Sequence, residues 1–399
     1  MKKLTSAPAL TALAIIWSTV VWIAVDMYLP ALPTLKATFP VSESTINAGL
    51  LTYGLAQAFG SLIAGPVSDR VGRKIPIIIG GSLFVAGNII CVFSPSIQML
   101  NIVRIFAGFG GGSICAIIVA VLKDCLSGDT LDKSITLTQS LIVMGPLVAP
   151  FLGSLVLFVV GWRGIFGLLA ILGAICLVWT ILLPETLARD KRADVSIPGS
   201  LILIARVGKN ASFTLCLLAL CTPALCVGVF LTTSSYIYID FFGLSSFGYS
   251  VYYGLTVIIQ MVAPFIYLFL HKHTTSKVIA FLCASLTVIS GIAMLFIGKF
   301  HPLVFLLACF PLFWAEGMSR PCSYLVLLRQ ADDTAGSASA LINFVFSVFV
   351  AIGTPLASAA IWQGNHIVAT GGSTLACGIA TFILLALLLL PIKSKILDD

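Results

Sequence analysis

Between two long apolar runs lies the stretch Gly65-Pro66-Val67-Ser68-Asp69-Arg70-Val71-Gly72-Arg73-Lys74. No residue between Ser44 and Val67 is charged, and none between Ile75 and Val103. A short basic turn between two such runs is typical of the connection between two membrane helices. Its arginines and lysine place the turn on the cytoplasmic side. Gly72 permits backbone conformations that other residues resist.

The composition supports a membrane protein. Of the 399 residues, 59% are hydrophobic and 9% are charged, whereas a soluble domain has about 25% charged residues. The net charge of +7 comes from basic residues in the turns between apolar runs, so it does not indicate a nucleic-acid partner. The eleven cysteines include no CxxC pair. We therefore expect small apolar side chains and no metal site.

A transmembrane helix needs about 20 apolar residues, and the chain contains twelve runs of this kind. They lie at 9–32, 44–66, 75–94, 97–123, 134–160, 164–184, 212–236, 248–270, 278–298, 302–328, 337–362 and 371–392. The charged interruption that follows the sixth run divides the chain. We therefore predict an all-α polytopic membrane protein with a bundle at 1–184, a cytoplasmic linker at 185–211 and a second bundle at 212–399.

The basic residues give the orientation of the chain. With the N-terminus inside, seventeen of the 22 lysines and arginines fall in cytoplasmic segments, as the positive-inside rule requires. We therefore expect both termini in the cytoplasm and a chain that crosses the cytoplasmic (inner) membrane many times. The first apolar run lacks a small-residue cleavage site, so we interpret it as a span and not as a removed signal.

The decapeptide resembles the loop signature of the major facilitator superfamily of transporters. This resemblance implies the major facilitator fold, with twelve transmembrane helices in two six-helix bundles around a central cavity. It also implies a conformational latch made of Gly65, Asp69, Arg70, Gly72 and Arg73. In the superfamily the aspartate of this loop caps the positive N-terminal end of the eleventh span, and Asp69 is expected to do so here.

Two charged residues inside apolar spans are candidates for proton coupling. Asp26 is the only acid within an apolar span of the first half. A carboxylate at membrane depth faces a cavity or a partner, or it is protonated; the alternative is an acid at the outer interface, because Pro30 and Pro33 follow. Arg104 needs an acidic or carbonyl partner and resembles the fourth-span arginine implicated in proton transfer in the superfamily. The alternative is an arginine that snorkels to the outer interface.

The fifth span contains Gly145, Pro146, Pro150 and Gly153. Prolines kink a membrane helix and glycines allow close approach of its neighbours, so this span is a candidate pivot. The pattern resembles the antiporter motif of exporters in the superfamily. The segments Asp26–Pro33, Trp162–Phe166 and Pro184–Leu187 resemble signatures of drug/proton antiporters of the Bcr/CflA type.

The tenth span places Glu316 and Arg320 one turn apart on one helix face. Two interpretations stay open, an internal ion pair and a second titratable or substrate-contacting site. Aromatic and amide side chains are the candidate lining of the substrate cavity. These are Trp22, Tyr53, Gln57, Gln139, Asn343 and Phe344.

The sequence therefore predicts a proton-coupled antiporter that exports small lipophilic compounds or drugs by alternating access. The alternative is an exporter of one specific metabolite with the same fold. Clustered His, Cys or paired acids at membrane depth are missing from the sequence, so we do not expect an enzyme. We expect no cofactor, with the proton gradient as the energy source. The expected partners are the substrate, protons and the lipid bilayer, and the chain is expected to act as a monomer.

Overall fold

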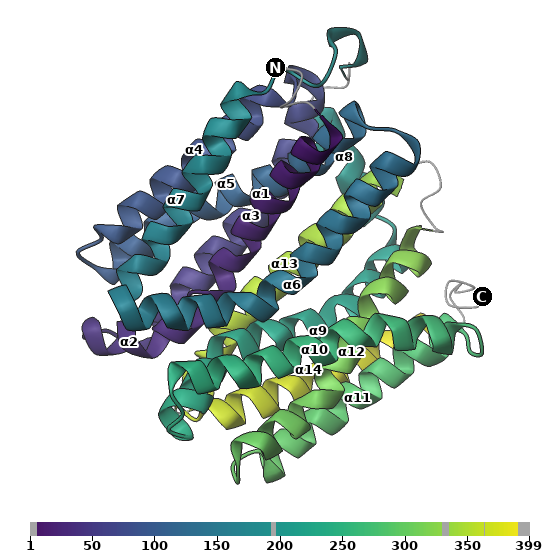
Figure 1. Cartoon of the computed structure of the whole chain (residues 1–399). Helices are drawn as coiled ribbons and strands as arrows, with labels where there is room; N and C mark the ends of the chain where they lie inside the picture. The colour runs from purple at the N-terminus through teal and green to yellow at the C-terminus, as the bar shows by residue number, and fades with distance from the viewer. Residues whose placement is uncertain (1–5, 193–196, 329–334, 363, 390–399) are drawn as a thin grey trace. The chain divides into compact units, whose positions relative to one another are not determined.

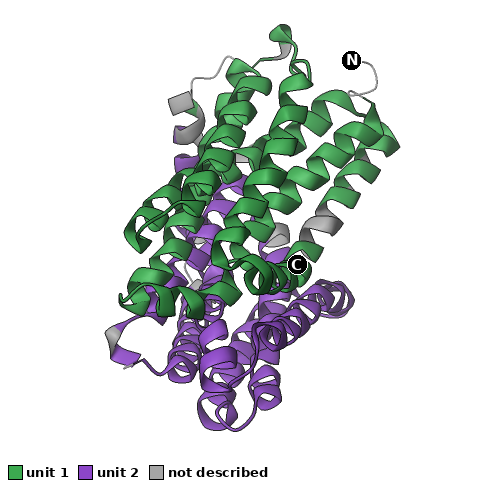
Figure 2. Cartoon of the chain, turned by 60° about the vertical axis from the view of Figure 1, so that its left-hand side comes forward, with its two compact units in different colours: residues 1–201 green, residues 202–399 purple. Residues whose placement is uncertain are grey.

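The computed structural model describes residues 6–192, 197–328, 335–362 and 364–389, and the regular structure in these ranges is helical (Figure 1). Contacts between Cα atoms divide the chain into two compact units, Met1–Leu201 and Ile202–Asp399, which Figure 2 colours green and purple. The predicted linker at 185–211 contains this division.

The first unit consists of long helices joined by short turns. They are α1 (Ala7–Asp26), η1 (Leu29–Ala31), α2 (Leu32–Thr38), α3 (Glu43–Val71), α4 (Lys74–Val92), α5 (Ile97–Cys125), α6 (Gly128–Val160), α7 (Trp162–Leu182) and η2 (Arg189–Lys191). The side-chain oxygens of Ser42 and Ser96 accept hydrogen bonds from Thr45 N at 3.4 Å and Met99 N at 3.3 Å. These serine caps explain why α3 and α5 begin where they do.

The second unit follows the same plan. Its helices are α9 (Ala211–Ser235), η3 (Tyr236–Phe241), α10 (Ser246–His271), α11 (Ser276–Ile297), α12 (Pro302–Leu328), α13 (Ala335–Ala357), η5 (Ala360–Trp362) and α14 (His366–Leu389). Among the described residues, eleven helical segments are long and apolar enough to cross a membrane. The twelfth predicted span is α6, whose shorter apolar part is Met144–Val160. The all-helical, multi-spanning fold class is therefore confirmed.

The predicted linker contains a helix that was not expected. Helix α8 (Ile197–Gly208) lies inside the segment that the sequence predicted as a polar linker. Twelve residues of α-helix extend roughly 18 Å, which is too short to cross a bilayer core of about 30 Å. The linker therefore contains a short helix in addition to the charged residues that its composition emphasised.

Glycines allow helices to touch through their backbones. A Cβ atom on Gly108 would lie 2.4 Å from the carbonyl oxygen of Tyr53, and one on Gly112 would lie 2.0 Å from that of Gln57. Helix α5 therefore crosses α3 in direct backbone contact, which the glycine run of α5 favours. In the second unit, α9 and α13 are in backbone contact in the same way. A Cβ atom on Gly228 of α9 would lie 1.9 Å from the carbonyl oxygen of Val350 of α13.

Candidate functional site

The turn between α3 and α4 is built around Arg73. Helix α3 ends at Val71 because Gly72 takes a φ of +105°, which residues with a Cβ rarely adopt. The buried Arg73 side chain donates from Nη1 to Ser68 Oγ at 2.8 Å and from Nε to Asp124 Oδ2 at 2.9 Å, and it also pairs with Asp69. Burial acts to lower the pKa of Arg73, but Asp124 and Asp69 outweigh it and raise the pKa. The group is therefore a permanent positive charge.

Glu185, just after α7, accepts four backbone hydrogen bonds. Its carboxylate binds the N–H groups of Arg73 at 2.8 Å, Lys74 at 3.2 Å, Thr186 at 2.9 Å and Leu187 at 3.0 Å. Partial burial acts to raise the pKa of Glu185, but the four donors together lower it below its usual range. This side chain therefore caps the start of α4 and ties the segment after α7 to the turn.

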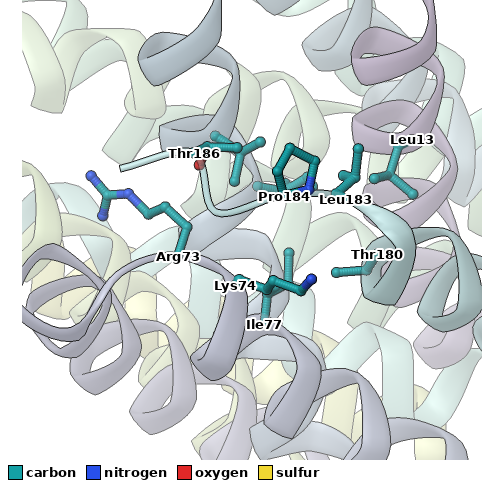
Figure 3. Close-up of a pocket in the computed structure, with 10 residues that line it drawn as sticks. Leu13, Arg73, Lys74, Ile77, Thr180, Leu183, Pro184 and Thr186 are labelled. Atoms are coloured by element: carbon teal, nitrogen blue, oxygen red, sulfur yellow. The ribbon is translucent and has the colours of Figure 1, made fainter. Parts of the chain in front are cut away.

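A small pocket lies beside this turn (Figure 3). Arg73 and Lys74 line it together with Leu183, Pro184 and Thr186 from the segment after α7. Its volume of about 20 Å³ is far below the roughly 300–1,000 Å³ of a ligand pocket. This pocket is therefore too small to hold a substrate.

Asp26 is the last residue of α1 and is 5% exposed. Two glycines of α6 lie along the same part of α1. A Cβ on Gly153 would lie 2.5 Å from the carbonyl oxygen of Met27, and one on Gly145 would lie 3.5 Å from Ile23 Cγ2. The helix that carries Pro146 and Pro150 therefore packs against α1 on both sides of Asp26 along the chain.

Arg104 of α5 is 2% exposed and surrounded by aromatic rings. Its Nε donates to the carbonyl oxygen of Gly49 at 2.8 Å. Its guanidinium carbon lies 4.3 Å from the ring centre of Tyr28, 4.8 Å from that of Tyr53 and 5.9 Å from that of Phe166. Each distance is within the range of a cation–π interaction. Arg104 is therefore held inside the first unit by one carbonyl and three rings.

Three buried polar atoms near Arg104 have no hydrogen-bond partner among the described residues. They are Arg104 Nη2, Tyr28 Oη and Asn101 Oδ1. Gly49 lies between the three residues, since a Cβ on it would lie 2.8 Å from Asn101 Oδ1 and 3.3 Å from both Tyr28 Oη and Arg104 Cδ. Such a cluster of donors and acceptors suits a bridging water molecule.

The predicted cavity residues lie in varied surroundings. Tyr53 is buried and donates to the carbonyl oxygen of Val21 at 3.2 Å, so its hydroxyl joins α3 to α1. Trp22 and Gln57 in the first unit and Phe344 in the second are half-buried, and Asn343 is exposed. The side chain of Gln139 lies outside the described residues. Substrate contact by these residues stays a prediction.

The charged pair of α12 is present but loose. Arg320 Nε lies 3.7 Å from Glu316 Oε1, an ion-pair distance that is too long for a hydrogen bond. Glu316 also accepts a hydrogen bond from Gln260 of α10. Within the described ranges, no three His, Cys, Asp or Glu residues are grouped as a metal site requires.

Sequence reasoning missed the partners of the basic turn. Arg73 was recognised by its motif, but Asp124 and Glu185 were not assigned to it. They lie at the ends of α5 and α7, and only their positions directly after apolar spans hinted that they belong to the same side of the bundle. The predicted cap on span 11 by Asp69 involves a helix of the other unit and stays a prediction, as does any part played by the exposed Arg70.

Comparison with known proteins agrees with this architecture. Residues 14–354 match the Major Facilitator Superfamily. The chain is 28% identical over 346 residues to the uncharacterized MFS-type transporter YdgK of Bacillus subtilis (strain 168), covering 83% of this chain and 84% of that protein. It is also 28% identical over 244 residues to the multidrug resistance protein MdtL of Shigella dysenteriae serotype 1 (strain Sd197), covering 60% of this chain and 61% of MdtL.

Solved structures share the fold at low sequence identity. The nucleoside transporter NupG superposes with a TM-score of 0.76 at 14% identity, covering 96% of this chain and 100% of that one. A D-xylose-proton symporter superposes with a TM-score of 0.71 at 16% identity, covering 98% of both chains. At these identities the likeness supports the fold alone. Together with the match over residues 14–354, it shows that this chain is a transporter that belongs to the Major Facilitator Superfamily.

Proposed function

We propose that this transporter is a proton-driven antiporter that exports small lipophilic compounds, of the Bcr/CflA drug/proton type. The observation that carries the proposal is the packing of α6 against α1 around Asp26. Gly153 touches the backbone of Met27 and Gly145 lies beside Ile23. The helix that carries the antiporter-like motif therefore lies against the segment that holds the acid, and a movement of either helix changes the surroundings of that acid.

Arg104 supports the same assignment. Tyr28, two residues after Asp26, lies against its guanidinium. Rings and a carbonyl stabilise a cation without neutralising it, so Arg104 keeps a positive potential near the end of α1. In the proposed cycle Asp26 takes up a proton from the outside and releases it inside, and the substrate binds when the proton has left. One charge that crosses 100 mV supplies about 2.3 kcal/mol, which supports roughly fifty-fold accumulation.

The relative MdtL supports export of drugs, because its name describes a multidrug resistance protein. Its match covers three fifths of each chain, so substrate identity rests on this proposal and not on the comparison. We also propose that both termini lie in the cytoplasm, that the host membrane is the cytoplasmic (inner) membrane and that the protein works as a monomer. A reporter that is active only in the cytoplasm, fused to the C-terminus, tests the orientation.

The turn between α3 and α4 is the proposed latch between conformations. Glu185 and Asp124 fix Arg73 and the start of α4, so the turn forms a rigid support. Asp69 is the group proposed to contact the positive end of the eleventh span. A charge-removing Asp69→Asn exchange should then slow transport without unfolding the protein, because half of the Asp69 side chain is exposed.

Proton movement in everted membrane vesicles tests the proposed function. Vesicles energised by respiration receive chloramphenicol, a sulfonamide or a cationic dye, and the lumenal pH is followed. We expect substrate-induced proton efflux in the wild type and its loss in Asp26→Asn. Asp129→Asn removes an exposed acid from the first turn of α6 and serves as the matched control. Equal proton efflux in wild type and Asp26→Asn would show that Asp26 is not the coupling group. No proton efflux with any of the compounds would favour export of one specific metabolite.

A further inference from the structure

The second unit carries an acid inside its apolar core. Glu316 of α12 is 1% exposed, and its helix neighbours Ala315 and Met318 belong to a continuous cluster of buried apolar residues from α9 to α14. A carboxylate in such a place is expensive unless it is paired, protonated or used. The proposed proton coupling through Asp26 does not use it.

The backbone of α12 comes close to α10 at this point. A Cβ on Gly317 would lie 2.7 Å from the carbonyl oxygen of Gln260 and 2.6 Å from Ala263 Cβ. This approach brings the Gln260 amide to Glu316, where its Nε2 donates to Oε2. The carboxylate is therefore held by a neutral donor on one oxygen, and its charge is not cancelled there.

Arg320 supplies the positive charge near the other oxygen, and it also stacks on an aromatic ring. Its guanidinium carbon is 3.7 Å from the ring centre of Phe346 on α13, whereas its Nε is 3.7 Å from Glu316 Oε1. The first distance describes a close cation–π stack. The second exceeds that of a hydrogen bond. The Arg320 side chain is also 46% exposed, in contrast to 1% for Glu316.

We propose that Glu316 and the face of Phe346 form a binding site for an organic monocation, and that Arg320 occupies this site as a tethered cation when substrate is absent. This inference rests on the proposed transport of small lipophilic compounds and names one substrate class for it. A buried carboxylate beside an aromatic face is the arrangement that recognises a substituted ammonium or guanidinium group. The exposed, loosely paired Arg320 leaves that site at a lower cost than a doubly hydrogen-bonded arginine would.

The other groups around Glu316 fit this assignment. The thiols of Cys221 on α9 and Cys283 on α11 are within electrostatic range of the carboxylate, and the Gln260 amide faces it from α10. Among the described residues, Arg320 is the cation paired with Glu316. An incoming organic cation therefore competes with one side chain alone.

Binding to the purified full-length protein tests the site. The probe is tetraphenylphosphonium, measured by equilibrium dialysis in detergent without a proton gradient, with neutral chloramphenicol as a second probe. Arg320→Gln removes the competitor, and we expect tetraphenylphosphonium affinity to rise on the order of tenfold. Arg320→Lys keeps a tethered cation and should stay near the wild type. Glu316→Gln should lose the cation affinity, and chloramphenicol affinity should not change in any of them.

A double variant keeps the test decisive if one single variant is unstable. Glu316→Gln/Arg320→Gln removes both charges of the pair, and it should bind tetraphenylphosphonium as weakly as Glu316→Gln alone. Unchanged or weaker cation binding in Arg320→Gln overturns the proposal, as does unchanged binding in Glu316→Gln. Because no proton gradient is present, these results are independent of the vesicle assay. If the vesicle assay shows no proton coupling through Asp26, the binding data still decide whether the cation site exists.

Discussion

Replacing Glu185 by glutamine should lower the stability of the first unit by removing a charged cap. Three backbone N–H groups point at Oε1 and one, that of Lys74, points at Oε2 at 3.2 Å. A glutamine oxygen can keep the three bonds to Oε1. Its amide then faces the Lys74 N–H, so one acceptor becomes a donor and the negative charge is lost.

The expected magnitude follows from these contacts. A hydrogen bond to a charged group contributes about 1.5–3 kcal/mol when buried, and Glu185 is exposed, so solvent screening reduces the loss to about 1 kcal/mol. For a unit of this size that corresponds to a fall of roughly 2–4 °C in Tm. The assay is thermal unfolding of the purified protein in detergent, with Asp190→Asn, an exposed acid in η2, as the matched control.

The pH dependence gives an independent check. The pKa of Glu185 is lowered in the folded protein from its ordinary value of 4.5. Its stabilisation is therefore fully present above 4.5 and is lost as the pH falls through the lower folded pKa. The Tm difference between wild type and Glu185→Gln should be constant near neutral pH and shrink in acid. A difference that is absent at pH 7, or that stays the same at pH 4 and below, would refute the capping role.

Three further predictions concern Gly72, Gly49 and Arg104. Gly72→Ala forces a residue with a Cβ to a φ of +105° and places that atom 2.4 Å from a carboxylate oxygen, so Tm should fall by an amount equivalent to about 1–3 kcal/mol; Gly65→Ala meets no atom within 4 Å and should leave Tm unchanged. Gly49→Ala puts a methyl group 2.8 Å from the amide oxygen of Asn101, so substrate-induced proton efflux should fall about tenfold. Gly167→Ala is the control, because the nearest neighbour of its methyl group would be 3.9 Å away, and it should keep wild-type efflux. Arg104→Lys keeps the charge but loses the planar stack on the rings, so efflux should fall while the amount of folded protein in the membrane is retained; wild-type efflux would show that the rings are not needed.

The helices were predictable because hydropathy alone determines them. A run such as 75–94 contains no charged residue, and in a bilayer such a run has little alternative to a helix. Helix α8 was missed for the complementary reason. Its apolar run is short and lies between the charged residues 189–194 and Arg206 and Lys209, so the segment resembles a solvated linker when composition is averaged over it.

The site was predictable one residue at a time and not as a set of contacts. The motif identified Arg73, but its partners Asp124 and Glu185 lie 51 and 112 residues further along the chain, and no periodicity connects them. An acidic or a carbonyl partner was anticipated for Arg104, and its Nε donates to the carbonyl oxygen of Gly49. The rings of Tyr28 and Phe166 were not anticipated, because an aromatic residue in an apolar span has the same hydropathy whether it faces lipid or a guanidinium.

The three arginines at these sites are stabilised in three different ways, and the difference separates their roles. Arg73 contacts two carboxylates and one hydroxyl, so its charge is balanced locally and the residue serves to hold a turn. Arg104 contacts a carbonyl and three rings, which leave its charge intact, and the proposed proton coupling through Asp26 uses such a charge nearby. Arg320 divides its contacts between a ring and a distant carboxylate, so it can leave. In the proposed transport cycle Arg73 keeps the turn fixed, Arg104 keeps a positive charge near Asp26 and Arg320 leaves the cation site, and each of these roles matches the way in which that arginine is stabilised.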